Sequence, residues 1–179
     1  MGNVVLYIAT SLDGYIATED GGVAWLDQFN DGGGEDFGYS AFQDTVGAVI
    51  MGGKTYRQVL GFGEWSYQNL PSYVVTSQPL AEHPDADVRR VEGDFGALVQ
   101  TIKAETDKDI FFVGGAQLIK AFVEQDLIDS YRIFVMPVML GKGIPLFAEL
   151  NSIQAVTLTD TRTFPQGVVE LRYTVQHIS

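Results

Sequence analysis

Apolar residues along this chain gather in short runs that alternate with segments of helical periodicity. Continuous apolar runs predict buried strands, because strands covered on both faces carry few polar residues. We expect such strands at residues 4–10, 46–51, 72–76, 88–91, 110–113 and 131–138. Apolar residues at helical spacing predict helices at residues 37–45, 55–60, 95–105 and 116–125, the third of them after a capping residue, Asp94.

Two more β-rich segments, 153–163 and 168–177, flank Phe164-Pro165-Gln166-Gly167, which is a hairpin signal. The order of elements predicts an α/β fold with three layers (α/β/α), a mostly parallel central sheet and an antiparallel C-terminal hairpin. With 179 residues and no internal repeat or linker, we expect a single domain spanning residues 1–179.

The most informative stretch is DIFFVGGAQLIKAFVEQ, residues 109–125, which reads as a strand, a glycine turn and a helix. Two glycines leave backbone N–H groups uncovered at a helix N-terminus, where the helix dipole favours an anion such as phosphate. The alternative is an ordinary strand-to-helix turn that needs glycine only for its dihedral angles. A bare Gly-Gly does not distinguish the two.

Three turns of this kind follow predicted strands. They are Gly52-Gly53-Lys54-Thr55, Thr76-Ser77-Gln78 and Gly114-Gly115-Ala116-Gln117. In parallel sheets, ligands bind beyond the carboxyl ends of the strands, so all three turns can line one crevice. Residues 18–35 form a long polar loop around Trp25, which is either a functional lid or a flexible surface excursion.

Composition excludes several classes of function. Eleven Lys and Arg against 23 Asp and Glu give a net charge of −12, which argues against nonspecific nucleic-acid binding. There is no cysteine and there are only two histidines, so we expect no disulfide and no metal site. No apolar run is long enough for a membrane span, and the N-terminus lacks a basic secretory signal, so we expect a cytoplasmic protein.

Five segments, taken in order, resemble the dihydrofolate reductase family. They are IATSLDGYIA, VIMGGKTY, VVTSQPL, IFFVGGAQLIKAF and VMPVMLGKGIPLF, and together they span nearly the whole chain. The last segment is similar to the branch that contains the reductase domain of riboflavin biosynthesis, the RibD C-terminal domain. The resemblance implies a reductase that uses NADPH, and a homodimer with contacts near Val135-Met136-Pro137 and the final hairpin.

The resemblance also implies which residues hold the cofactor. In the family, the first turn lies against the cofactor phosphates, the second holds the adenosine ribose and its phosphate, and the third covers the pyrophosphate. Ala9 and Ile16 match positions near the nicotinamide. The implied cofactor-binding residues are Ala9, Ile16, Gly52, Gly53, Lys54, Thr55, Thr76, Ser77, Gln78, Val113, Gly114, Gly115, Ala116, Gln117 and Leu118.

One position departs from the family pattern. The family usually carries an arginine where this chain has Gly53. Arginine grips a phosphate through two parallel hydrogen bonds, so its loss removes a selector for the 2′-phosphate of NADPH. Lys54 or Arg57 can compensate, and NADH becomes a possible cofactor.

Hydride transfer needs a proton source, and the resemblance places the acid at Asp36, with Glu35 as a substitute. A partly buried acid beside the substrate would have a raised pKa. The alternative is that Asp36 only caps the helix at residues 37–45. Trp25 matches a tryptophan of a mobile loop that closes on the substrate, and Tyr39 is a second candidate for substrate binding.

We therefore expect a reductase that transfers hydride from NADPH to a small heterocyclic or carbonyl-like substrate, of the riboflavin-pathway or dihydrofolate type. The alternative from another class is a non-catalytic nucleotide-binding protein that retains the fold. A purely structural dimerisation module would leave the three turns unexplained. Oxidation of the cofactor with some substrate separates the first hypothesis from the other two.

Overall fold

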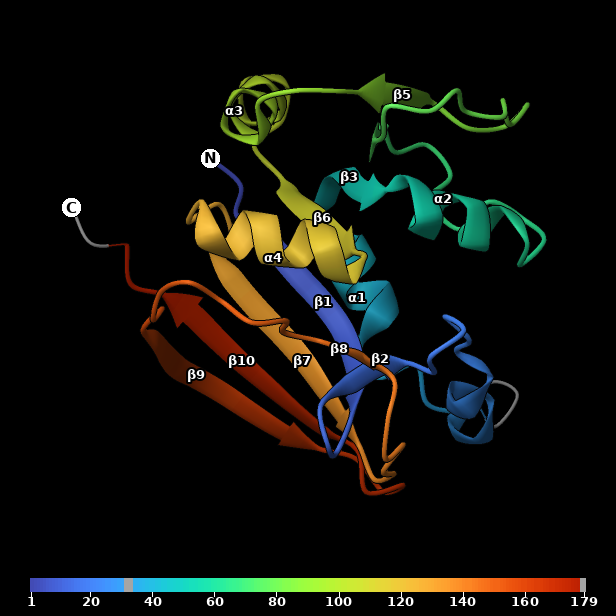
Figure 1. Cartoon of the computed structure of the whole chain (residues 1–179), viewed down its shortest axis with the longest axis vertical. Helices are drawn as coiled ribbons and strands as arrows, with labels where there is room; N and C mark the ends of the chain where they lie inside the picture. The colour runs from blue at the N-terminus through green and yellow to red at the C-terminus, as the bar shows by residue number, and fades with distance from the viewer. Residues whose placement is uncertain (31–33, 178–179) are drawn as a thin grey trace.

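The computed structural model describes residues 1–30 and 34–177. Within them, a twisted eight-stranded sheet has the order β5-β4-β3-β6-β1-β7-β10-β9 (Figure 1). Its strands are β1 (Val4–Ser11), β3 (Val46–Gly52), β4 (Ser72–Val75), β5 (Val88–Val91), β6 (Asp109–Gly114), β7 (Ser130–Met136), β9 (Val156–Thr163) and β10 (Val169–Val175). A small second sheet pairs β2 (Tyr15–Ala17) with β8 (Ile144–Pro145).

Strand directions confirm the predicted sheet. The pairs β1–β6, β1–β7, β3–β6, β3–β4 and β4–β5 are all parallel. The last two strands reverse this pattern, since β10 runs antiparallel to both β7 and β9. The sheet is therefore mostly parallel and ends in an antiparallel hairpin, as expected from the order of elements.

Helices cover both faces of the sheet. Successive residues of a strand point to opposite faces, and β1 and β6 follow this rule. Leu6 and Phe112 face one core, which is covered by α3 (Phe95–Glu105) and α4 (Ala116–Glu124). Val5 and Phe111 face the other core, with α1 (Tyr39–Gln43) and α2 (Gly53–Leu60). Figure 1 shows α4 in front of the sheet and α1 behind it.

The first long loop has more structure than its composition indicated. Residues 24–29 form a 3-10 helix, η1 (Ala24–Phe29), whose Phe29 is buried against Phe134 and Met136 of β7. Gly21 O accepts a hydrogen bond from Gln58 Nε2 in α2 at 3.0 Å, so the loop is attached to a helix beside the first glycine turn. Of the predicted loop, residues 31–33 lie outside the described part.

No helix in the described ranges combines the length and the apolar character that crossing a lipid bilayer requires.

Candidate active site

The three turns predicted to share a crevice lie next to one another, because β4, β3 and β6 are adjacent parallel strands. Gly115 N donates a hydrogen bond to Thr55 Oγ1 at 3.2 Å, which joins the first turn to the third. Gly53 and Thr76 join the first turn to the second, since a Cβ at Gly53 would lie 2.9 Å from Thr76 Oγ1. We call residues 52–55, 76–78 and 114–117 the glycine-turn cluster.

Two glycines of this cluster differ in how strictly their positions require glycine. Gly114 has φ +104°, and a Cβ there would lie 3.0 Å from Ile119 Cδ1, so a side chain would be strained and crowded. The peptide bond between Gly114 and Gly115 is cis. Gly52 has ordinary dihedral angles, and a Cβ there would lie 3.8 Å from Gly114 O and 4.0 Å from Leu118 Cδ2. A methyl group at Gly52 would therefore fit in ordinary van der Waals contact.

The helices that start in this cluster differ from α3 at their N-termini. Asp94 caps α3 by accepting a hydrogen bond from Ala97 N. The capping residues of α2 and α4 are Gly52 and Gly115, which offer no side-chain acceptor. The first N–H groups of an α-helix have no partner within the helix, so both starts present donors suited to an anion.

The residue expected to be arginine, Gly53, is packed against other side chains. A Cβ at this position would meet Thr76 at 2.9 to 3.0 Å, and would lie 3.4 Å from a terminal nitrogen of Arg57. Arg57 therefore places its guanidinium beside the position where a side chain at residue 53 would begin. Lys54 is exposed at the start of α2. The second turn is held by Arg90, which donates to Ser77 O at 3.0 Å.

Several other members of the predicted cofactor set have side chains that pack into a core or lie exposed to solvent. The side chains of Val113 and Leu118 pack into the two cores on opposite faces of the sheet. Ala116 and Gln117 lie in the first turn of α4, and Ser77 and Gln78 are exposed. Ile16 lies in β2 and packs against the core under α3 and α4, so the structure does not bring it to the cavity described next.

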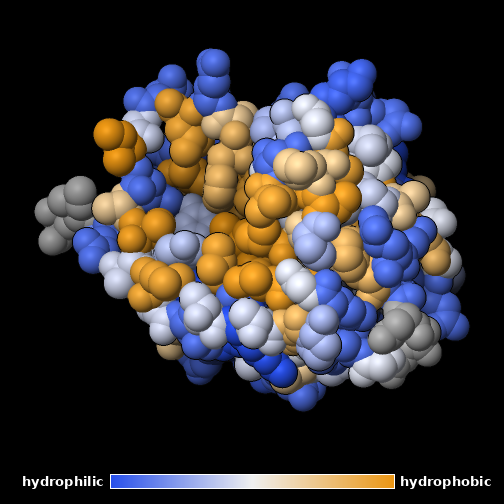
Figure 2. All heavy atoms as spheres, turned by 90° about the horizontal axis from the view of Figure 1, so that it is seen from below, coloured by the Kyte–Doolittle hydropathy of each residue, from blue (hydrophilic) through white to orange (hydrophobic). Residues whose placement is uncertain are grey.

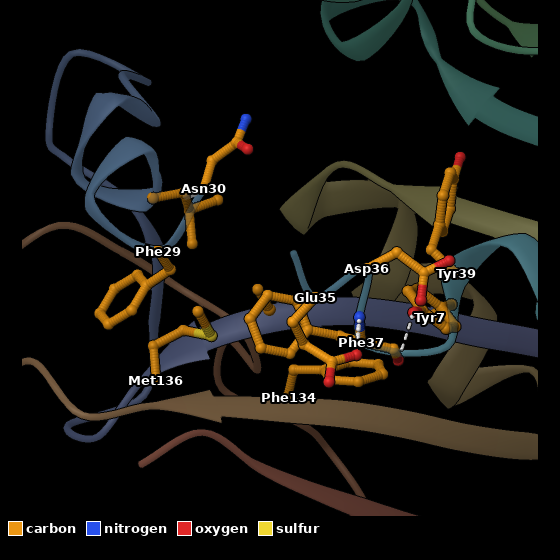
Figure 3. Close-up of a pocket in the computed structure, with 11 residues that line it drawn as sticks. Tyr7, Phe29, Asn30, Glu35, Asp36, Phe37, Tyr39, Phe134 and Met136 are labelled. Atoms are coloured by element: carbon orange, nitrogen blue, oxygen red, sulfur yellow. Dashed lines mark hydrogen bonds between the residues drawn. The ribbon is translucent and has the colours of Figure 1, made fainter. Parts of the chain in front are cut away.

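A cavity of about 300 Å³ lies on the other side of β1, between η1, β7 and residues 35–39. Figure 2 shows that apolar side chains gather around a depression on the lower surface of the molecule. Most of the lining is aromatic or apolar, and its polar groups are two carboxylates, two phenols and an amide. The lining residues are Tyr7, Ala9, Leu26, Phe29, Asn30, Glu35, Asp36, Phe37, Tyr39, Phe134 and Met136 (Figure 3).

The cavity contains one of the two predicted substrate-binding residues. Tyr39 lines it directly, and so does Ala9, which was predicted to lie near the nicotinamide. Trp25 does not, although its neighbours Leu26 and Phe29 do, and the Trp25 ring packs against the apolar cluster behind the cavity. Trp25 Nε1 is buried without a hydrogen-bond partner among the described residues.

Asp36 caps α1 in this structure. Its carboxylate accepts hydrogen bonds from Gly38 N at 2.8 Å and from Ser40 N at 3.0 Å. These bonds, chiefly those from Ser40, lower the pKa of Asp36, and the charge of Arg162 acts in the same direction. The residue is also exposed. The expectation of a partly buried acid with a raised pKa is therefore wrong. The carboxylate instead binds backbone N–H groups at the start of α1, although the N-cap residue itself is Gly38.

Glu35 also lines the cavity, and its Oε1 accepts a hydrogen bond from Phe37 N at 2.9 Å (Figure 3). Phe37 and Gly38 both have positive φ, at +55° and +77°. This local turn places the two carboxylates at the rim of the cavity while Phe37 packs on Phe164.

The sequence model of the RibD C-terminal domain family matches residues 3–170. The chain belongs to this family. Its relative YwjB, from Bacillus subtilis (strain 168), is 42% identical over 170 residues, which cover 94% of this chain and 95% of YwjB. The match to the family contains every residue of the glycine-turn cluster and of the cavity lining.

Solved structures place this RibD C-terminal domain in the dihydrofolate reductase-like fold. A candidate riboflavin biosynthesis protein from Shewanella sp. PV-4 has a TM-score of 0.87 and 29% identity, covering 98% of this chain and 99% of its own. A dihydrofolate reductase from Enterococcus faecalis, in complex with NADP(H), has a TM-score of 0.67 and 15% identity, covering 98% of each chain. The latter likeness shows the fold alone. The chain thus has a reductase-type fold, as its five segments indicated.

Sequence reasoning missed a buried network beneath the cavity of this RibD C-terminal domain. Glu170 is fully buried, and its carboxylate accepts hydrogen bonds from Arg132 Nε at 2.7 Å and from Arg172 Nε at 2.9 Å. Burial acts to raise the pKa of Glu170, but the bonds and charges of the two arginines outweigh it, and the pKa is lowered. The available signal was the presence of charged residues inside otherwise apolar strands.

Tyr7 was missed as well. It lies two residues before Ala9 in β1, so both side chains point to the same face, and both line the cavity. The sequence contained the necessary signal, because residues two positions apart on a predicted strand share a face, and this rule places Tyr7 beside Ala9. The Arg132 guanidinium lies over the Tyr7 ring, 5.0 Å from its centroid, which links the phenol to the buried network.

Proposed function

We propose that this protein is an NAD(P)H-dependent reductase that transfers hydride to a C=N or C=O bond of a small planar heterocyclic or carbonyl-like substrate. The observation that carries the proposal is the adjacency of two unlike sites. Gly114 of the glycine-turn cluster ends β6, which is the direct neighbour of β1 in the sheet, and Ala9 of β1 lines the cavity. A dinucleotide can therefore extend from the cluster to the cavity.

The glycine-turn cluster suits the phosphates of such a cofactor. The helix starts at Gly52 and Gly115 offer backbone N–H groups, and neither capping residue has a side chain that would compete with a phosphate for them. Lys54 and Arg57 add positive charge, and Arg57 stands beside Thr76, where a 2′-phosphate would be selected. This arrangement favours NADPH over NADH in our proposal. When bound, the reduced nicotinamide supplies the hydride.

The cavity suits a flat, uncharged or amine-bearing substrate. Phe29, Phe37, Tyr39 and Phe134 give it aromatic walls, and no cationic side chain is among the described lining residues. A carboxylate with a lowered pKa is ionised at neutral pH, so in this proposal Asp36 orients the substrate or a water molecule by accepting hydrogen bonds. Closure of the η1 segment, with Trp25, would exclude water.

The second candidate function is binding of a nucleotide without turnover. Two observations favour it: Gly53 stands in place of an arginine, and the carboxylate of Asp36 is committed to capping α1. The first removes a selector for the phosphorylated reductase cofactor, and the second weakens the case for proton transfer by Asp36.

We also propose a homodimer in the cytoplasm. Support for the homodimer comes from β9, which pairs on one side only and is exposed along its whole length, including Leu158 at 50% exposure. Sedimentation velocity tests it, and a monomer at micromolar concentration would contradict it.

The deciding experiment titrates the purified protein with NADPH and NADH while following tryptophan fluorescence. We expect quenching with NADPH at lower concentration than with NADH, and about tenfold weaker NADPH binding in Lys54→Ala and in Arg57→Ala, because each removes a charge-assisted phosphate contact. NADH binding should change less in Arg57→Ala. A Trp25→Phe variant shows whether the signal comes from the η1 segment.

Turnover then separates the two functions. Steady NADPH oxidation with a member of a panel of cyclic imines and aromatic carbonyl compounds supports the reductase. Binding of NADPH without oxidation across the panel supports the nucleotide-binding protein. If neither cofactor binds at millimolar concentration, both functions fail and only the fold stands.

A further inference from the structure

The geometry points to Tyr7 as the proton donor of this site, a role that rests on the proposed reductase function. Its phenol would hydrogen bond to the nitrogen or oxygen of the substrate double bond while hydride reaches the carbon. Arg132, which does not line the cavity, is the positioning residue behind the phenol.

Tyr7 is placed to reach the reacting atoms. Its side chain lines the cavity from β1, on the same face as Ala9, where the proposed nicotinamide lies. The distance between alternate residues along a strand is about 7 Å, which suits two groups that act on the same double bond. The Tyr7 hydroxyl has one long contact, to Phe37 O at 3.5 Å (Figure 3). Such a contact is weak, so a substrate acceptor can replace it.

The other candidate donors fit less well. Asp36 has a lowered pKa and both of its oxygens accept backbone hydrogen bonds, so it holds no proton at neutral pH. Glu35 uses one oxygen to accept from Phe37 N. The Tyr39 hydroxyl points away from the other lining residues in Figure 3, whereas the Tyr7 hydroxyl lies among them. Tyr7 is the remaining O–H donor among the described residues that line the cavity.

The surroundings of Tyr7 have two effects. They keep the hydroxyl protonated at rest, and they stabilise the phenolate that forms after proton transfer. Burial raises the pKa of Tyr7 well above its ordinary value, as do Glu170, Tyr39 and Asp36, so the resting phenol is neutral. Arg132 opposes these effects. Its guanidinium lies 5.0 Å from the centre of the Tyr7 ring and is held there by Glu170.

The step is balanced. Hydride leaves the reduced nicotinamide and forms a C–H bond at the substrate carbon, the π electrons of C=N or C=O move to the heteroatom, and that atom takes the Tyr7 proton. The nicotinamide is oxidised and the substrate reduced. Tyr7 is left as a phenolate beside Arg132 and regains its proton from water after the product leaves.

The test measures hydrogen bonding directly, without turnover. The probe is 4-aminoacetophenone labelled with ¹³C at its carbonyl, a planar aromatic ketone of a size that suits the cavity. We expect the infrared carbonyl stretch of the bound probe to move to lower frequency in the wild-type protein. We expect the displacement to be lost in Tyr7→Phe and retained in Tyr173→Phe, which removes the same atom from the opposite face of the sheet.

A second readout uses the enzyme with NADPH and the substrate found in the panel. Tyr7→Phe should lower kcat by roughly 10²-fold or more with little change in NADPH affinity, as expected for loss of a general acid. Equal carbonyl frequencies in wild-type protein and Tyr7→Phe would overturn the proposal, as would absence of probe binding at millimolar concentration. Failure of NADPH to bind would instead overturn the proposed function, and the infrared result would be unaffected.

Discussion

The glycine-turn cluster and the cavity lie side by side across β1, yet they are built from opposite chemistry. The cluster consists of glycines, hydroxyls, helix starts and the cation Lys54, with the Arg57 guanidinium beside it. The cavity consists of aromatic rings with two carboxylates, Glu35 and Asp36, and no described cation in its lining. The difference shows which part of a ligand each half can accept: phosphates in the first, and a planar group with hydrogen-bond donors in the second.

The two halves also differ in what holds them in place. The cluster depends on backbone conformation, such as the positive φ of Gly114. The cavity depends on side chains that are supported from below by the buried network of Arg132, Glu170 and Arg172. Substitutions can therefore damage one half and leave the other intact, and they test the comparison directly.

The largest effect should come from Glu170→Ala. Removing a fully buried carboxylate leaves Arg132 and Arg172 without their shared partner, and breaking such a network costs about 3–5 kcal/mol in the free energy of unfolding. Urea denaturation followed by circular dichroism measures the loss. Glu170→Gln retains the shape and one acceptor oxygen, so we expect a smaller loss from it. A change below 1 kcal/mol in Glu170→Ala would show that the cavity does not depend on this network.

A pair of glycine substitutions separates folding from binding in the cluster. Gly114→Ala forces a side chain into positive φ and against Ile119, which we expect to cost about 2–4 kcal/mol. Gly52→Ala places its methyl group in ordinary van der Waals contact at ordinary dihedral angles, so its cost should be a few tenths of a kcal/mol. Gly52→Ala should nevertheless weaken NADPH binding, because its methyl group lies at the helix start that is proposed to hold a phosphate.

Urea denaturation and NADPH titration, applied to both glycine variants, check these expectations. Unchanged NADPH affinity in Gly52→Ala would show that no phosphate approaches the start of α2 at Gly52. Equal stability of the two variants would mean that the backbone of the third turn is not constrained as its φ indicates.

The smallest effect should come from Asp36→Asn, and it depends on pH. Because the pKa of Asp36 is lowered by folding, its contribution to stability is present above the unfolded value of about 3.9 and is lost as the pH falls through the folded value. We therefore expect the difference in urea midpoint between wild type and Asp36→Asn to shrink from pH 7 to pH 3. NADPH affinity should not change, since Asp36 lies outside the glycine-turn cluster. A difference that grows at low pH would contradict the capping role.

Much of the cluster was predictable because its signals are local. Asp109–Gly114, Gly115 and Ala116–Glu124 are contiguous, so apolar runs and glycines identified the strand, the turn and the helix. The cap at Asp94 was equally local and was confirmed. The placement of Ile16 near the nicotinamide was not local, because it rested on a matched position; its side chain packs against the core under α3 and α4, and its role stays a prediction.

The cavity was harder to predict because its residues come from separate parts of the chain. Tyr7 and Phe134 meet only because β1 and β7 are neighbours in the sheet, with ring centroids 4.7 Å apart. The role of Asp36 depended on the direction of the nearby N–H groups. The positive φ angles of Phe37 and Gly38 form a turn in which Gly38 N donates to the Asp36 carboxylate.

By itself, the sequence determined the α/β fold, the strand directions and the three turns at the carboxyl ends of the strands. Hydrophobic periodicity and glycine positions are local features that can be seen in the sequence alone. Only the tertiary structure decided that Arg132, Glu170 and Arg172 join beneath Tyr7, and that the Gly53 position is crowded by Thr76 and flanked by Arg57. The reason is physical: burial and charge pairing depend on which distant strands become neighbours, and those distances are set by the packing of the whole sheet.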